Sequence, residues 1–563
     1  MVQPFQCAAR ILVATFAMAG VSVVPAAEDA QPDILLIVAD DLGYSDLGAF
    51  GGEIATPNLD ALARRGLMLT NFHAGATCSP TRAMLMSGVD HHRAGLGSMT
   101  EALRFNPAQQ GKPGYEGHLN DRVVTIATLL NEAGYATRMV GKWHLGYEPK
   151  DHPSARGFEH SFALLAGGAQ HFDGGRAIPF DPESLHREDG REVEWPAGHY
   201  SSDFYTDRMI EYFGAAPVDK PLFAYAAYTA PHWPLQAPDQ YIEKYSGRYS
   251  AGWDAVRAER LARMKRLGLV ANADIVAARP ESVPAWKDLP DEQKKRHARL
   301  MEIYAAMVDN LDINVGRLLD AYEALDRKRD TIIVFMSDNG AEAMVPESAP
   351  LPGLPEWIRE NFDNRFENLG HRGSHAGYGP GWAHVSGAPF RSFKGSAYEG
   401  GTHTSALVVL PHGRAGRVDD FVHVLDVVPT LLGLAGVGLP GNSHRGRPIH
   451  ALEGRAFIDA TGAVVPVDRE HFAAHELFGH RNVRVGTLKA VSEWAGMSGS
   501  AAWELFDLAS DPGEQRNLAA MRGKALGELT ARYEEWARAH GVIMPSTQAP
   551  SYGTKQAPAG EQM

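Results

Sequence analysis

Four short apolar runs, each ending abruptly in polar residues, constrain the fold of this chain more than any other feature. They occupy residues 34–39, 136–140, 222–228 and 331–336. Nearly unbroken runs of β-branched, aromatic and other apolar residues are typical of strands that are buried on both faces of a sheet. Such a sheet needs helices on both faces, so the runs predict an α/β protein.

Helical patterns separate the apolar runs. Residues 58–65 follow a threonine–proline cap, and residues 124–133 end at Gly134, a residue type that often terminates helices. Residues 299–325 form a long amphipathic stretch. Strands alternating with helices predict an open, doubly covered sheet, and ligands of such sheets bind beyond the carboxyl ends of the strands.

Polar residues are concentrated at the ends of the four apolar runs. One shared active-site rim, to which every strand contributes its last residues, accounts for all of them. These endings are Asp40-Asp41, Gly141-Lys142-Trp143-His144, Pro231-His232 and Ser337-Asp338-Asn339-Gly340.

The rest of the chain divides into insertions and a second domain. Residues 162–200 and 346–378 read as loops over the site and are expected to determine specificity, whereas residues 245–295 are charged and partly helical. After about residue 455 the pattern changes to short strand-like pieces and one helix, residues 523–539. We therefore predict a catalytic domain, a small C-terminal domain of antiparallel sheet plus helix, and a disordered tail rich in Pro, Gln, Ser and Gly. The predicted boundaries are 28–455, 456–544 and 545–563.

The N-terminus has the features of a signal peptide, predicted over residues 1–27. Arg10 precedes an apolar stretch over residues 11–24, and small residues follow it. An uncleaved anchor is the alternative, but the apolar stretch is short. Export to the periplasm or medium is therefore expected, and the body of the chain contains no apolar run long enough to span a bilayer.

Cleavage would leave Cys78 as the one cysteine of the chain, because the other is Cys7. A lone thiol is either a small buried hydrophobic group or a reactive one. Residues 78–82 read Cys-Ser-Pro-Thr-Arg, in which Ser79 is predicted to cap a helix with Pro80 in its first turn. Cys78 then lies at a helix N-terminus, which favours anions and is expected to lower the thiol pKa.

The paired acidic endings predict a metal site. Asp40-Asp41 and Asp338-Asn339 supply carboxylate and amide oxygens, which are ligands for Ca²⁺ or Mg²⁺, and no cysteine–histidine spacing suggests zinc. Either pair alone is more simply explained as a cap of a turn, but two such pairs after buried strands favour a metal. A thiolate is a poor match for a hard cation, so an oxygen nucleophile derived from Cys78 fits better.

The basic residues near these motifs suit an anionic substrate. Arginine and lysine bind sulfate or phosphate oxygens through charge-assisted hydrogen bonds, and histidines can transfer protons. The candidates are Arg82, Lys142 and Lys394, with His144 and His232. The net charge of −14 argues against a nucleic-acid partner and stable membrane association, but leaves a small anion open.

These motifs together resemble the type I sulfatase family, of the alkaline phosphatase-like superfamily, and within it the bacterial arylsulfatases. Residues 78–82 match its Cys-x-Pro-x-Arg signature, and residues 141–146 its second signature. Asp40-Asp41-Leu42-Gly43 and residues 337–340 are similar to its metal-binding segments, Lys394 to its late lysine, and residues 504–518 to its C-terminal segment.

The resemblance implies a large, mainly parallel sheet and hydrolysis of sulfate monoesters to an alcohol or phenol and sulfate. It implies that another enzyme, the formylglycine-generating enzyme, oxidises Cys78 to formylglycine. The implied metal is one Ca²⁺, bound by Asp40, Asp41, Asp338, Asn339 and the modified Cys78. The implied catalytic residues are Cys78, Arg82, Lys142, His144, His232 and Lys394. Two alternatives remain: a phosphate- or phosphonate-ester hydrolase on the same scaffold, and a non-catalytic exported calcium-binding protein.

Overall fold

The computed structural model describes Met1 and residues 31–270, 276–468, 470–494 and 502–546. The predicted signal peptide after Met1 and residues 547–563 of the predicted tail lie outside the described residues. Within the described ranges, no helix is both long and apolar enough to cross a membrane.

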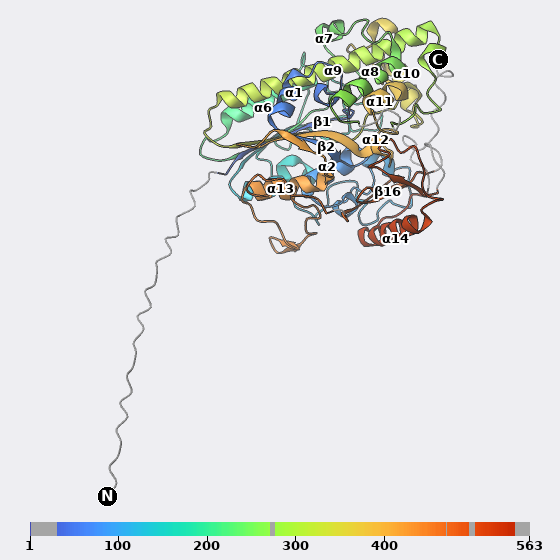
Figure 1. The fold of residues 1–563 in the computed structure, drawn as a ribbon. Helices are drawn as coiled ribbons and strands as arrows, with labels where there is room; N and C mark the ends of the chain where they lie inside the picture. Colours follow the sequence, from blue (N-terminus) through green and yellow to red (C-terminus); the bar gives the residue numbers. More distant parts are fainter. Residues whose placement is uncertain (2–30, 271–275, 469, 495–501, 547–563) are drawn as a thin grey trace.

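One large sheet forms the centre of the molecule, with eleven strands in the part of the chain that the structure describes (Figure 1). Its order is β10-β2-β9-β8-β1-β7-β3-β4-β5-β6, and β11 also pairs with β2. The strands are β1 (Asp33–Ala39), β2 (Leu67–His73), β3 (Ala136–Lys142), β4 (His160–Leu164), β5 (His186–Glu188), β6 (Arg191–Val193), β7 (Leu222–Ala227), β8 (Thr331–Ser337), β9 (His403–Val409), β10 (Gly416–Val418) and β11 (Val422–His423).

The four apolar runs are the middle of this sheet, which confirms the predicted fold class. They form β1, β7, β8 and β3, and each of these strands is parallel to its neighbour within the group. Burial on both faces explains their unbroken apolar sequence: β1, β3 and β7 are buried at every position. Strand β9 runs antiparallel to β2 and β8, so the sheet is mixed.

Helices cover both faces of the sheet (Figure 1). One layer contains α1 (Pro57–Arg65), α6 (Ser201–Ala215), α8 (Gly252–Arg266) and the long α9 (Asp291–Ala324). The opposite layer contains α2 (Cys78–Ser87), α5 (Ile126–Glu132) and α13 (Val427–Leu434). Successive apolar side chains along each strand point alternately to the two helix layers. The sheet therefore separates two large hydrophobic cores.

Two sequence expectations about the elements need correction. Helix α9 begins eight residues before the predicted position 299, because its first turns are polar and carry no apolar period. Residues 162–200 are not loop throughout: β5 and β6 extend the sheet there, and α10 (Leu354–Asn361) lies in the other predicted loop. These short, partly exposed elements lack the apolar signature of the central strands.

The C-terminal part forms a separate antiparallel sheet, as predicted, with the order β14-β15-β16-β17. Its strands are β14 (Phe472–Leu477), β15 (His480–Val485), β16 (Leu488–Ser492) and β17 (Glu504–Asp507), and α14 (Gly523–His540) packs against them. The remaining elements are short: α3 (His91–Ala94), α4 (Thr100–Leu103), α7 (Asp239–Lys244), α11 (Gly379–Ser386), α12 (Glu399–Thr402), β12 (Ser443–His444) and β13 (Arg447–Pro448).

Candidate active site

Two neighbouring parallel strands bring the acidic residues together. Ala39 at the end of β1 lies opposite Ser337 at the end of β8, so the residues after both strands meet at one edge of the sheet. The backbone N–H of Asp41 donates to Asp338 Oδ1 (3.2 Å), and Asn339 Nδ2 donates to Asp41 Oδ1 (2.7 Å). The two predicted metal-binding pairs therefore form one cluster.

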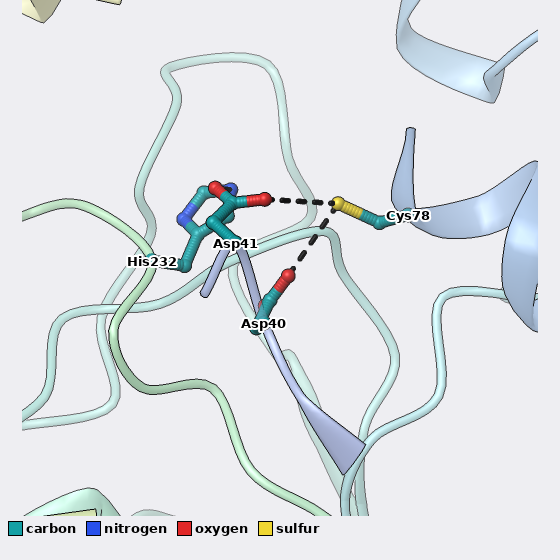
Figure 2. Close-up of side chains that lie close together, drawn as sticks. All are labelled: Asp40, Asp41, Cys78 and His232. Carbon is teal, nitrogen blue, oxygen red and sulfur yellow. Dashed lines mark hydrogen bonds and ion pairs between the residues drawn. The ribbon is translucent and has the colours of Figure 1, made fainter. Parts of the chain in front are cut away.

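Cys78 reaches this cluster from α2, of which it is the first residue. Its Sγ lies 3.5 Å from Asp40 Oδ1 and 3.9 Å from Asp41 Oδ1 (Figure 2). The predicted cap by Ser79 is wrong, because the helix begins two residues earlier and its N-cap residue is Thr77. The position of Cys78 at a helix N-terminus is nevertheless as predicted.

The surroundings of Cys78 do not activate a thiol. Burial raises the pKa of the Cys78 thiol well above its ordinary value, although Lys142 and Lys394 act in the opposite direction. The carboxylates of Asp40 and Asp338 raise it further. The expected lowering of this pKa is therefore wrong, because two nearby acids and complete burial outweigh the helix N-terminus. An unmodified Cys78 would be protonated and a poor nucleophile.

Lys142 is the last residue of β3 and holds Asp40. Its Nζ lies 2.8 Å from Asp40 Oδ1 and 2.7 Å from Oδ2. The preceding Gly141 has a φ of 96°, and a Cβ there would lie 1.9 Å from the carbonyl oxygen of Ala227 in β7. Only glycine permits this approach, so the Gly-Lys motif fixes where the lysine leaves the strand.

Lys394 holds the second acid. Its Nζ lies 2.8 Å from Asp41 Oδ1, and also 3.0 Å from Glu342 Oε2. The backbone N–H of Lys394 donates to the carbonyl of Ala341, which joins the lysine loop to the segment after β8. Glu342 was not predicted from the sequence. It follows the metal-binding motif by three residues and carries no motif of its own.

Arg82 lies one turn into α2 and binds the third acid. Its Nε and Nη2 lie 3.0 Å and 2.7 Å from Asp338 Oδ2, and its Nη1 donates to the carbonyl of Lys142 (3.0 Å). The guanidinium group is fully buried. Arg82 therefore orients Asp338 and ties α2 to β3, and its Nη2 also lies 3.8 Å from Asp40 Oδ1.

His232 lies in the loop after β7 and faces the cluster (Figure 2). Its Nδ1 is 2.5 Å from the carbonyl oxygen of Trp233, and its Nε2 is 3.5 Å from Asp41 Oδ2. A ring nitrogen next to a carbonyl carries the proton, so Nε2 of the neutral ring presents a lone pair to the site. Burial lowers the pKa of His232 well below its ordinary value, despite Asp41.

His144 lies two residues after Lys142, and its Nε2 is 3.0 Å from Glu101 Oε1. Burial lowers the pKa of His144, and Glu101 partly offsets this effect. His144 and Asp41 both have positive φ, at 57° and 68°, a conformation that non-glycine residues adopt mainly where function or packing demands it. Glu101, in the short helix α4, was missed by the sequence analysis, since nothing in its local sequence marks it.

The carboxylates of Asp40, Asp41 and Asp338 are matched by Arg82, Lys142 and Lys394, with shortest contacts of 2.7–2.8 Å. Glu342 shares Lys394, so the cluster has one more acid than cations. Burial still raises the pKa of Asp40 to about 7, because Lys142 only partly compensates and the other acids add to the effect. Asp41 differs: burial alone would raise its pKa, but Lys394 and His232 outweigh this and lower it.

The donor atoms fit a hard divalent cation. Ligand atoms of Asp40, Asp41, Cys78 and His232 all lie within 4.8 Å of one another. The Oδ1 atom of Asn339 is buried there and lacks a hydrogen-bond partner among the described residues. An orphaned amide oxygen beside buried carboxylates is what a Ca²⁺ or Mg²⁺ site offers before the ion binds.

A sheet of this topology, with buried acids, cations and a helix N-terminus at its carboxyl edge, defines a hydrolase of the alkaline phosphatase-like fold. The comparisons with known proteins then specify the family. The sulfatase family model matches residues 32–437, and the chain belongs to the sulfatase family. It is therefore a sulfuric ester hydrolase.

The relatives agree with this assignment. The chain is 43% identical to an uncharacterised sulfatase of Schizosaccharomyces pombe over 92% of its own length and 95% of that protein. It is 39% identical to an arylsulfatase of Klebsiella aerogenes over 76% of its own length and 92% of that protein. The crystal structure of Ps i-CgsB in complex with k-i-k-neocarrahexaose shares the fold, with a TM-score of 0.62 at 24% identity, covering 92% of this chain and 95% of that one.

Proposed function

We propose that the chain hydrolyses sulfate monoesters in the manner of arylsulfatases, with a formylglycine derived from Cys78 and a bound Ca²⁺. The observation that carries the proposal is the position of Cys78 Sγ, between two acids that face it at 3.5 Å and 3.9 Å. A buried, protonated thiol has no useful chemistry there, whereas an oxygen group at the same position would complete a hard metal site.

The metal proposal rests on this chain's donor set. Asp40, Asp41, Asp338 and Asn339 would hold the ion together with the modified Cys78. A bound Ca²⁺ supplies positive charge that polarises the sulfate ester and lowers the pKa of a coordinated hydroxyl. Because three cations of the chain already offset most of the acidic charge in the cluster, much of the ion's charge would remain available for the anionic substrate.

The formylglycine proposal explains turnover. In its hydrated form, this group supplies two hydroxyls: one displaces the alcohol from sulfur, and the other allows sulfate to be expelled with the aldehyde restored. An unmodified thiol lacks the second hydroxyl. The formylglycine-generating enzyme is therefore a proposed transient partner.

The remaining side chains would bind charge and move protons. Lys142 and Lys394, which bind the two acids next to Cys78, would offset charge on the sulfuryl oxygens, while Arg82 keeps Asp338 oriented. His144, steadied by Glu101, would hold a nucleophile hydroxyl. Lys394, or His232 once its Nε2 has taken up a proton, would give a proton to the leaving oxygen.

The proposal extends to the whole chain. We propose an exported protein with a catalytic domain over residues 28–455 and a smaller domain over residues 456–544. If Cys78 is modified before folding, protein made in a host that lacks the modifying enzyme will fold but show low specific activity. Co-production of that enzyme should restore sulfate release without changing thermal stability, and full activity without it would contradict the proposal.

The mass of the Cys78-containing peptide tests the nucleophile directly. We expect formylglycine in active protein, and a Cys78→Ala variant that folds but releases no sulfate from 4-nitrophenyl sulfate. An alkylatable thiol in fully active protein would overturn the mechanism. Parallel assays with 4-nitrophenyl phosphate test the phosphatase alternative, which a preference for phosphate would support. Wild-type activity of Cys78→Ala would instead favour a non-catalytic role for this cluster.

A further inference from the structure

A pocket opens beside Cys78, and its lining bears on which alcohols can leave the sulfate group. Its inner end is polar and belongs to the site already described, with Cys78, His144, His232 and Lys394 in the lining. The sulfate group would occupy this end, so the rest of the pocket would receive the leaving group.

The outer walls of the pocket are apolar. They are lined by Met99, Ala102, Phe105, Ala177, Ile178, Trp233, Met344 and Leu351. Several of these side chains belong to a hydrophobic cluster that also contains the buried residues Leu354 and Ile358 of α10. The walls are therefore packed from behind, and a leaving group would meet a preformed apolar surface.

These walls come from the insertions between sheet elements. Ala177 and Ile178 lie in residues 162–200, and Leu351 lies in residues 346–378, the two segments expected from the sequence to determine specificity. The hydrophobic cluster joins them to one another. Two insertions far apart in the sequence therefore contribute to one apolar wall, together with residues 99–105 and with Trp233 and Met344, which follow β7 and β8.

The remaining polar side-chain groups in the lining are two acids and the indole N–H of Trp233, which has no hydrogen-bond partner among the described residues. Glu101 Oε1 is 3.0 Å from His144 Nε2. Asp181 Oδ1 accepts a hydrogen bond from the hydroxyl of Tyr147 (3.2 Å). Beyond the catalytic groups, the lining residues that the structure describes include no lysine, arginine, asparagine or glutamine. A second sulfate or a carboxylate on the leaving group would find acids rather than cations, and sugar hydroxyls would find few partners.

We propose that this pocket selects sulfate esters of uncharged apolar alcohols, with alicyclic, aromatic or long alkyl leaving groups, and rejects sugar sulfates. The proposal rests on the sulfatase function proposed above. Its physical basis is asymmetric: an apolar ring gains by leaving water for this wall, whereas the several hydroxyls of a sugar lose water and meet few hydrogen-bonding groups.

Two esters with the same skeleton separate these effects. Cyclohexylmethyl sulfate and glucose 6-sulfate both carry a six-membered ring and a primary sulfate, and differ in the ring oxygen and hydroxyls. Calorimetric titration of both into the full-length Cys78→Ala variant measures binding without turnover. We expect cyclohexylmethyl sulfate to bind at least about 100-fold more tightly, since several buried hydroxyls go unpaired in the sugar. Equal affinities, or a preference for the sugar, would overturn the proposal.

A near-isosteric change in the wall provides a second measurement. In the Cys78→Ala background, Met344→Gln places an amide in the apolar wall and should reduce the preference about 10-fold or more. Met521→Gln makes the same change at a side chain that is 76% exposed, far from the pocket lining, and should leave the ratio unchanged. An unchanged ratio in the Met344 variant would overturn the role of this wall.

Sulfate release from 4-nitrophenyl sulfate by the modified wild-type protein tests the underlying function separately. If release occurs but the binding preference is absent, the substrate class alone is wrong. If the preference is present but no sulfate ester is hydrolysed, the proposed function fails and the apolar pocket stands.

Discussion

Asp40, Asp41 and Asp338 each have a cationic partner, and the three partners come from different segments of the chain. Asp40 is bound by Lys142, Asp41 by Lys394 and Asp338 by Arg82. Buried charges that are removed from water need such partners, because an unpaired charge in this environment is costly. The side chains are therefore positioned before any ligand arrives.

Glu101→Gln tests whether the carboxylate next to His144 positions that residue. The amide keeps the size but removes the charge from the contact of 3.0 Å. We expect kcat for sulfate release to fall about 10- to 100-fold with KM changed less than about threefold, because a misplaced group harms the transition state more than binding. Steady-state kinetics measure both constants.

The matched control is Glu148→Gln, at an exposed carboxylate in the loop after β3, which should leave both constants unchanged. Glu101 also lines the pocket. A raised KM with unchanged kcat would therefore show that Glu101 acts on substrate binding rather than through His144.

Arg82→Lys tests whether the guanidinium group that binds Asp338 through two nitrogens is required. A lysine keeps the charge but cannot bind Asp338 and the Lys142 carbonyl at once. The buried groups left unpaired should lower the free energy of unfolding by about 2–3 kcal/mol, and sulfate release should fall by at least about 10-fold. Urea denaturation followed by fluorescence measures the stability. The same change at Arg365, whose pair with Asp363 is exposed, should leave the free energy of unfolding nearly unchanged. Equal losses at both positions would contradict the role of Arg82.

At the scale of elements, the ends of β1 and β8 form one unit because their register places Ala39 opposite Ser337. The sequence predicts this arrangement well: both strands are continuous apolar runs, and both end in acidic pairs. Shorter elements are less predictable. The strands β5 and β6 lie at the sheet edge, where exposure removes the apolar pattern on which the prediction depends.

A bound ion should join these two strand ends and stabilise the fold. Protein treated with a chelator should melt a few degrees lower than protein with excess Ca²⁺, since about 2.7 kcal/mol is gained when the ion is at 100 times its Kd. Differential scanning calorimetry with a Ca²⁺ titration measures the shift. Asn339→Ala removes the orphaned amide oxygen and should weaken the response to Ca²⁺.

The matched control is Asn361→Ala, at an exposed position on α10, which should respond to Ca²⁺ as the wild type does. A melting temperature that is independent of Ca²⁺ and of chelator in the wild-type protein would contradict a metal site at these strand ends.

At the scale of the whole molecule, the C-terminal sheet is joined to the central domain by buried polar contacts that no motif reveals. His92 of α3 lies between Asp90 and Glu476 of β14, with its Nε2 3.0 Å from Glu476 Oε2. The partners are 384 residues apart, so local sequence carries no signal of the contact. The same reason explains why Glu101 and Glu342 were missed, whereas residues within motifs, such as Arg82, were found.

The contacts of His92 with Asp90 and Glu476 should make the free energy of unfolding depend on pH. Burial by itself lowers the pKa of His92, but hydrogen bonds to Asp90 and Glu476 outweigh this and raise it from 6.5 to about 9. A group whose pKa is raised on folding stabilises the native state fully below its unfolded pKa. That contribution, about 3 kcal/mol for such a shift, is lost as the pH rises through the folded pKa.

The stability difference between wild type and His92→Gln should therefore be largest at and below pH 6.5 and shrink as the pH approaches 9. Chemical denaturation at intervals across this range measures the difference, and the comparison at each pH cancels other groups that titrate in both proteins. His412→Gln, at a side chain that is 88% exposed, should show no such trend. A difference that grows with pH would mean that His92 is neutral in the folded protein, and that the two sheets are joined by packing, through contacts such as that of His92 with Trp536 of α14, rather than by charge.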